Sequence, residues 1–210
     1  MYRHVVFDLG GTLIDTYPEL DAALLEVVAL GGGEVTREQV ETLTRQSTAT
    51  AIAELSERFG IPAAHFEAAT TALKRRWRDS PPPAMPGARA VMDLVAANGG
   101  RSFVVTHRDR DSATSLLEQL GLVPDDLVCP GDGFPRKPDP TMHRVIAQRH
   151  GLDPADCVGV GDRPIDAQAA RAAGMAAAVL EVPGVDNDTV AEHRLGSMVD
   201  LLALLTATAR

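Results

Sequence analysis

Short runs of apolar residues alternate with amphipathic stretches along most of the chain, and this pattern predicts strands separated by helices. The strand candidates are His4–Leu9, Ser102–Thr106, Asp126–Cys129, Cys157–Gly161 and Ala176–Leu180. Helical spacing is found at Ala88–Asn98, Arg110–Leu120, Pro140–His150, Ile165–Ala173 and Ser197–Thr206. Because strand–helix–strand alternation favours right-handed crossovers, we predict an α/β fold with a Rossmann-like three-layer core around a parallel sheet.

The segment between the first two strand candidates has a different pattern. Only helical periods are found there, at Glu19–Leu30, Thr36–Arg45, Thr48–Phe59 and Ala63–Arg78. Thr36 and Gln39 have the spacing of a capping box at the start of the second of these helices. The segment ends in the prolines 81–83, which form a stiff connector. We therefore predict an inserted helical cap domain, residues 16–83, in a core formed by residues 1–15 and 84–210.

Composition narrows the range of partners. The formal net charge of −9 argues against nucleic acid as the main partner, although a local site can still be cationic and bind a small phosphate. Cys129 and Cys157 fit no metal or redox spacing, so we expect buried free thiols. The chain starts without a signal-peptide pattern, and its apolar runs are far shorter than the about 20 residues of a membrane span. We expect a cytoplasmic protein that binds no membrane.

Polar residues that could bind a ligand or take part in catalysis lie where the predicted strands end. Asp8 follows the apolar run at residues 5–7 of the first strand candidate, Thr106 ends the second, and Asp162 and Asp166 follow the strand at residues 157–161. Lys137 stands before a proline in the connection that leads to the next helix. Taken singly, the aspartates could cap helices and the lysine could be a surface residue. Together they lie at the edge of an open α/β sheet where active sites form.

These residues belong to motifs that resemble those of the haloacid dehalogenase (HAD) superfamily. Phe7-Asp8-Leu9-Gly10-Gly11-Thr12-Leu13-Ile14-Asp15 resembles the first motif, Thr106 the second, Lys137-Pro138 the third and Gly161-Asp162-Arg163-Pro164-Ile165-Asp166 the fourth. The resemblance extends over about the whole chain, since the helical segment also lies where the family has its cap. It indicates the phosphatase-type branch, which includes phosphoglycolate phosphatase and β-phosphoglucomutase-like proteins.

The resemblance implies a mechanism and a set of site residues. Asp8 would be the nucleophile that forms an aspartyl-phosphate, with Mg²⁺ offsetting the repulsion between the two anions. The implied metal ligands are Asp8, the main-chain carbonyl of Gly10, Asp162 and, directly or through water, Asp166. The implied substrate-binding residues are Gly11, Thr106, His107, Arg108 and Lys137. The expected substrate is a small phosphorylated metabolite.

Gly10 is a departure from the family pattern, because the family has a second aspartate at this position. That aspartate protonates the leaving oxygen and then activates water, a contribution typically of about 10²–10⁴-fold. Three outcomes stay open: the substrate has a good leaving group, as an acyl or aryl phosphate does; His107 or Arg108 supplies the proton; or the chain binds phosphorylated ligands with weak turnover. His107 is the candidate acid because histidine ordinarily titrates near neutral pH.

The dehalogenase branch of the superfamily is an alternative, because it also lacks the second aspartate. Halide release needs neither a proton nor a metal. However, Asp162 and Asp166 would repel an anionic haloacid at a site without a cation. We therefore favour a Mg²⁺-dependent phosphohydrolase, with the helical insert closing over its site to exclude water.

Overall fold

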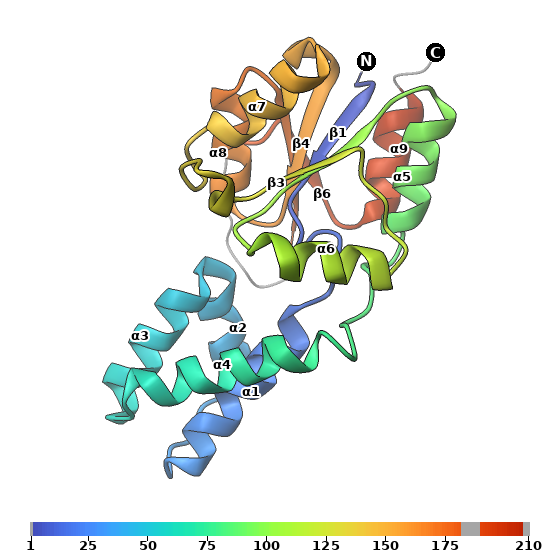
Figure 1. Ribbon diagram of the computed structural model, residues 1–210. Coiled ribbons are helices and arrows are strands. Elements are labelled where there is room, and N and C mark those ends of the chain that lie inside the picture. Colours follow the sequence, from blue (N-terminus) through green and yellow to red (C-terminus); the bar gives the residue numbers. More distant parts are fainter. Residues whose placement is uncertain (1, 182–189, 208–210) are drawn as a thin grey trace. The chain divides into compact units, whose positions relative to one another are not determined.

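The computed structural model describes residues 2–181 and 190–207. Contacts divide the chain into two compact units, one formed by Met1–Ile14 with Pro83–Arg210 and the other by Asp15–Pro82. The first unit contains the strands, and the second contains helices α1 to α4, drawn in blue to green in Figure 1. This N-terminal helical region is consistent with the predicted cap.

The described strands form one parallel sheet of six, in the order β3-β2-β1-β4-β5-β6. Their bounds are β1 His4–Phe7, β2 Ser102–Val105, β3 Asp126–Val128, β4 Cys157–Gly161, β5 Ala176–Leu180 and β6 His193–Leu195. The parallel α/β prediction is confirmed. The strand β6 was missed, because a three-residue segment with His193 and Arg194 at a sheet edge has no apolar run.

Helices cover both faces of the sheet, which gives the three predicted layers. In Figure 1, α7 and α8 lie on one side of the strands and α5 and α9 on the other. The helices of this unit are α5 Ala88–Ala97, α6 Arg110–Gln119, α7 Thr141–His150, α8 Pro164–Ala172 and α9 Met198–Ala207. Buried apolar side chains fill the layer under α7 and α8, among them Val6, Phe103, Val128, Met142, Ile146 and Val179. Burial of this apolar surface stabilises the sheet that carries the strand ends.

Helix α8 packs closely against β4 because β4 has a glycine at the contact. A Cβ atom at Gly159 would lie 2.4 Å from Cβ of Ala170. We expect Gly159→Ala to lower the free energy of unfolding by about 1–3 kcal/mol, as overpacking does, in urea titrations followed by circular dichroism. Gly131→Ala is the matched control, since a Cβ at Gly131 would meet no atom within 4 Å. Equal losses in both variants would contradict the predicted close packing.

The helical unit consists of α1 Tyr17–Leu30, α2 Arg37–Gln46, α3 Thr48–Phe59 and α4 Ala63–Arg76. The predicted capping box is present at the start of α2, where Thr36 and Gln39 bond each other's main-chain N–H groups. Asp21 of α1 is fully buried, yet it accepts a hydrogen bond from Thr44 Oγ1 at 2.6 Å and lies 3.6 Å from Arg45 Nη1. These contacts offset part of the cost of burying its carboxylate, and burial still holds the pKa of Asp21 above its ordinary value.

Two further sequence expectations concern thiols and membranes. Cys129 and Cys157 are free and buried, as predicted, and burial raises the pKa of their thiols to about 11 and about 12. Among residues 2–181 and 190–207, the structure has no helix with the length and apolar content that crossing a bilayer requires.

Candidate active site

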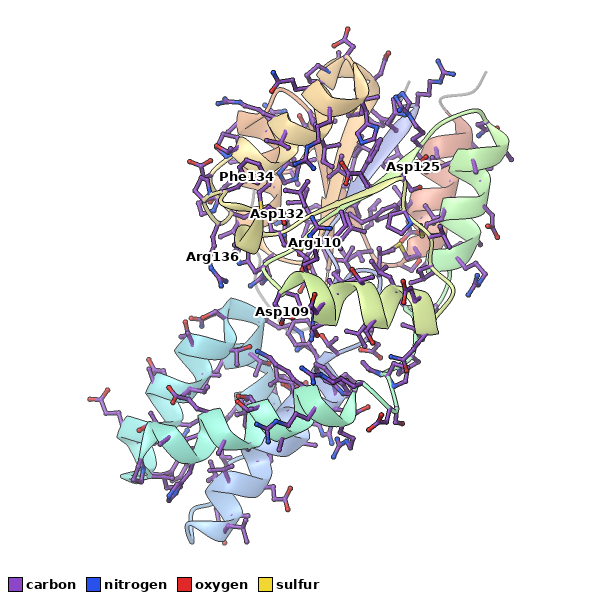
Figure 2. All side chains as sticks on the ribbon, in the orientation of Figure 1. Asp109, Arg110, Asp125, Asp132, Phe134 and Arg136 are labelled. Carbon is purple, nitrogen blue, oxygen red and sulfur yellow. The ribbon has the colours of Figure 1, made fainter. Side chains whose placement is uncertain are left out.

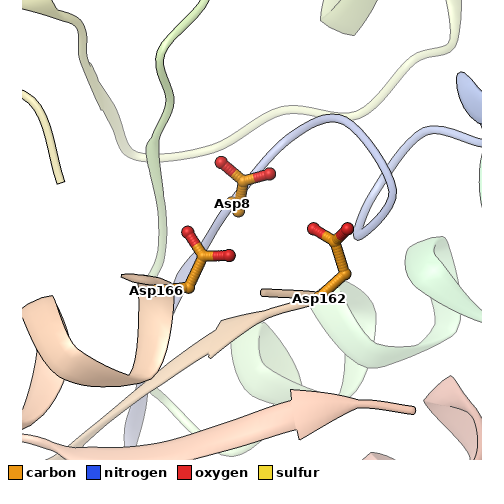
Figure 3. Close-up of side chains that lie close together, drawn as sticks. All are labelled: Asp8, Asp162 and Asp166. Atoms are coloured by element: carbon orange, nitrogen blue, oxygen red, sulfur yellow. The ribbon is translucent and has the colours of Figure 1, made fainter. Parts of the chain in front are cut away.

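Three buried carboxylates meet at the carboxyl end of the sheet. Asp8 follows β1, Asp162 follows the neighbouring strand β4, and Asp166 lies in the first turn of α8. One oxygen from each carboxylate lies within 4.8 Å of the other two, and the three side chains face one another in Figure 3. The fold therefore brings together residues that are separated by more than a hundred positions in the sequence.

Lys137 links two of these carboxylates. Its Nζ lies 2.5 Å from Oδ1 of Asp8 and 2.6 Å from Oδ1 of Asp166, and it donates a hydrogen bond to the main-chain oxygen of Val105 at 3.0 Å. The side chain is only 1% exposed. The ammonium donates hydrogen bonds to Asp8 and to Val105 and forms an ion pair with Asp166, so the lysine is held in one position.

The pKa values show how these charges depend on each other. Burial acts to lower the pKa of Lys137, but the carboxylates of Asp166 and Asp8 hold it above its ordinary value. Burial acts to raise the pKa of Asp166, and the charges of Lys137 and Arg163 hold it below its ordinary value. For Asp8, burial raises the pKa against the opposing charge of Lys137. The single ammonium of Lys137 therefore balances part of the charge of two carboxylates, Asp8 and Asp166.

The loop before Lys137 is anchored to helix α6. Arg110 makes a two-pronged ion pair with Asp132, with Nε to Oδ1 at 2.9 Å and Nη2 to Oδ2 at 2.6 Å; both side chains are labelled in Figure 2. Asp132 also accepts a hydrogen bond from the main-chain N–H of Cys129 at 2.9 Å. Paired N–H···O bonds of this kind fix orientation, so they hold the start of the segment that leads to Lys137.

The residues after β2 lie beside the carboxylates. Thr106 is buried, and its hydroxyl accepts a hydrogen bond from the main-chain N–H of Arg108 at 3.2 Å. The Nε2 atom of His107 is buried and has no hydrogen-bond partner among the described residues. Burial, followed by the charges of Lys137 and nearby arginines, lowers the pKa of His107 to about 4. The expectation that His107 titrates near neutral pH is therefore wrong, because its surroundings disfavour a further positive charge.

The turn after Asp8 requires glycine at only one of its two glycine positions. Gly11 has φ 84°, a left-handed conformation that favours glycine, whereas Gly10 lies outside that region. The hydroxyl of buried Thr12 donates to Oδ1 of Asp162 at 3.4 Å. The turn thus connects β1 to the end of β4, and the backbone conformation of Gly10 does not itself require glycine.

The donor set fits a small divalent cation. Asp8, Asp162 and Asp166 offer oxygen ligands within one cluster, and oxygen is the ligand atom that Mg²⁺ prefers. Lys137 balances part of their negative charge. Buried carboxylates need compensating charge, so a cation at this cluster is favoured physically.

The sequence reading missed Arg163, which stands between the two aspartates of the fourth motif. Its main-chain N–H donates to Oδ2 of Asp166 at 3.1 Å, and its Nε lies 4.0 Å from the same oxygen. The side chain is only 16% exposed. Its position in the sequence could have predicted this, since a residue that stands between two site carboxylates at a strand end must lie near them.

Comparison with known proteins agrees with the motifs. The sequence model of the haloacid dehalogenase-like hydrolase family matches residues 2–174. The chain is 31% identical over 192 residues to a phosphoglycolate phosphatase of Rhodospirillum rubrum, covering 86% of this chain and 80% of that protein. It is 33% identical over 181 residues to the fructose-1-phosphate phosphatase of Escherichia coli, covering 83% and 94%.

A solved structure has the same fold. A conserved haloacid dehalogenase-like protein of unknown function from Agrobacterium tumefaciens superposes with a TM-score of 0.86 at 19% identity, and the match covers 100% of both chains. The family match spans most of the sequence, including the residues after β1, β2 and β4. The chain therefore belongs to the haloacid dehalogenase-like hydrolase family.

Proposed function

We propose that this protein is a Mg²⁺-dependent phosphohydrolase that acts on a small phosphorylated metabolite through an aspartyl-phosphate at Asp8. The observation that carries the proposal is the buried cluster of Asp8, Asp162 and Asp166 with Lys137 bonded to two of them. A nucleophilic carboxylate beside an ammonium and further oxygen ligands has the parts that phosphoryl transfer needs.

Each residue has a distinct part in this proposal. Asp8, Asp162, Asp166 and the main-chain carbonyl of Gly10 hold the ion, which when bound offsets the repulsion between Asp8 and the phosphate. Asp8 attacks phosphorus. The phosphoryl oxygens are bound by the Thr106 hydroxyl, the Lys137 ammonium and main-chain N–H groups of the turn that contains Gly11, and the fixed positions of these groups lower the cost of ordering the substrate. The N–H of Gly11 itself bonds the main-chain oxygen of Ile14 at 2.8 Å, so Gly11 contributes by shaping this turn.

His107 and Arg108 complete the proposed substrate-binding set. Because the pKa of His107 is about 4, the ring is neutral at pH 7 and serves as a hydrogen-bonding group there. The guanidinium of Arg108 donates to Ser112 Oγ at 3.1 Å, which holds it near the start of α6. The position of both residues directly after Thr106 supports contact with the phosphorylated ligand.

The substrate class follows from the relatives and from the helical unit. The relatives are named for phosphoglycolate and fructose 1-phosphate, a phosphorylated acid and a phosphorylated sugar. The helical unit lies in the sequence where the family has its cap, so residues 16–83 are assigned as the cap and residues 1–15 and 84–210 as the core. A cap that closes over the site favours a small substrate over a phosphoprotein.

Because Gly10 provides no acid, we expect the rate of hydrolysis to depend strongly on the leaving group of the substrate. We expect the wild type with Mg²⁺ to hydrolyse an aryl phosphate such as p-nitrophenyl phosphate, whose leaving group needs little protonation, and to be slow on glycerol phosphate, an alkyl phosphate. Gly10→Asp restores an acid and should raise kcat on glycerol phosphate by about 10²–10⁴-fold. Steady-state phosphate release with Mg²⁺ or with chelator measures both.

Gly10→Asn is the matched control, because it adds a side chain of the same size without an acid. Equal gains in both variants would show that proton transfer is not the cause. Fast glycerol phosphate turnover by the wild type would show that another group donates the proton. Trace turnover in every variant would favour a phosphate-ligand binding protein, and halide release from a haloacid in chelator would favour the dehalogenase alternative.

A further inference from the structure

Two segments of the core unit carry side chains that, in the proposed function, bind the phosphoryl oxygens. One segment follows β2 and contains Thr106; the other follows β3 and ends in Lys137. The strands β2 and β3 are parallel neighbours, so both segments start at the carboxyl ends of adjacent strands. The separation between the Thr106 hydroxyl and the Lys137 ammonium therefore depends on what holds the two segments together.

Two cross-links join these segments. In the first, the ammonium of Lys137 donates to the main-chain oxygen of Val105, the last residue of β2, at 3.0 Å. In the second, Arg110, the first residue of α6, bonds both carboxylate oxygens of Asp132 at 2.9 and 2.6 Å (Figure 2). Arg110 also donates to the main-chain oxygen of Leu127 in β3 at 2.7 Å. Three bonds from one rigid planar fork hold the guanidinium in a single orientation.

The chain is also held between this ion pair and the two binding groups. Asp132 accepts a hydrogen bond from the main-chain N–H of Cys129 at 2.9 Å and donates its own N–H to the main-chain oxygen of Cys129 at 3.1 Å. Phe134, between Asp132 and the lysine, packs against the apolar core. On the side of α6, the main-chain N–H of Arg108 donates to the Thr106 hydroxyl at 3.2 Å. A shift of the ion pair would therefore be passed on to both segments.

The ion pair is better suited to fixing geometry than to stabilising the fold. The side chain of Arg110 is 45% exposed and that of Asp132 is 18% exposed, and exposed ion pairs contribute little to folding. Paired N–H···O bonds, however, fix orientation. Catalysis is sensitive to such geometry, since misplacing a catalytic group by about 1 Å can cost about 10²-fold in rate.

We propose that Arg110 and Asp132 are positioning residues for phosphoryl transfer, which set the separation between the Thr106 hydroxyl and the Lys137 ammonium without touching the substrate. This inference rests on the proposed function above. The two side chains act as a unit, because neither can form the two-pronged contact alone. Loss of the pair should lower kcat more than it raises KM, because the transition state depends more strictly on these positions than the bound substrate does.

The test measures kcat and KM for p-nitrophenyl phosphate with Mg²⁺ in Arg110→Gln, Asp132→Asn and the double variant, each with a thermal melt. Each single variant should lose about 10- to 100-fold in kcat, with KM changed far less and a melting temperature close to that of the wild type. The double variant should lose no more than either single variant, because the two residues act as a unit. Arg110→Lys keeps the charge but not the planar fork, so it should recover only part of the loss.

Arg194→Gln is the matched control, because Arg194 is similarly exposed and forms an ion pair with Glu181 at the opposite edge of the sheet. It should leave kcat and KM unchanged. Wild-type kcat in both single variants, or losses that multiply in the double variant, would overturn the inference. So would a loss of kcat that only follows a smaller fraction of folded protein. These outcomes leave the proposed function intact, because the wild type still turns over with Mg²⁺. Absence of Mg²⁺-dependent turnover in the wild type would overturn both.

Discussion

Replacement of Asp8 by asparagine is expected to lower kcat by about 10⁴–10⁶-fold on any phosphorylated substrate, the range seen when an enzyme loses its nucleophile. The amide of asparagine has nearly the same shape but cannot form the acyl-phosphate bond to phosphorus. The variant should still fold, because Lys137 keeps its ion pair with Asp166 and its hydrogen bond to the main-chain oxygen of Val105. The measurement is phosphate release in the presence of Mg²⁺, together with a thermal melt.

A second readout identifies the covalent intermediate. Wild type quenched in acid after mixing with ³²P-labelled substrate should retain label on the protein, and the Asp8→Asn variant should retain none. Asp93→Asn is the control, since Asp93 is an exposed aspartate of α5 in the same unit. Equal labelling of wild type and Asp8→Asn would assign the nucleophile to another residue.

The fold could be predicted because its elements are local and regular in sequence. Helix α3 was predicted with its observed bounds, Thr48–Phe59, because Gly60 ends the helical period in a left-handed conformation. The buried strands β2 and β4 consist almost entirely of apolar residues and glycine, as is typical of strands covered on both faces. Strand β6 lies at the edge of the sheet and pairs with β5. An edge strand need not be a continuous apolar run, so β6 has no such signal.

The site could be predicted as a set of residues, but not as a set of contacts. Motif spacing indicated that Asp8 and Lys137 belong to one site, yet their 2.5 Å contact joins positions 129 residues apart and depends on the whole sheet. The pKa of His107 could not be predicted either. It depends on burial and on charges from Lys137, Arg163 and Arg136, which lie in other loops. Three-dimensional proximity decides such values.

The largest effect on stability is expected at Lys137, which lies close to two buried carboxylates. Lys137→Met is expected to lower the free energy of unfolding by about 3–5 kcal/mol in chelator at pH 7, because it leaves Asp8 and Asp166 buried without their ammonium. Methionine fills a similar volume, so a cavity contributes little. The measurement is a urea titration of the variant and the wild type. Lys74→Met is the control, since Lys74 is an exposed residue of α4.

The pH and metal dependence of this loss separates charge from packing. Without Lys137 we expect the buried carboxylates to have raised pKa values. They should therefore become protonated as the pH falls from 7 toward 5, which reduces the destabilisation of the variant. In the wild type, Asp166 has a lowered pKa and contributes stability that is lost as the pH falls through that pKa. The difference between the two proteins should therefore shrink on acidification. Mg²⁺ should stabilise the variant more than the wild type, because the ion supplies the missing positive charge. A loss that is the same at both pH values and with or without Mg²⁺ would mean that Lys137 acts through packing alone.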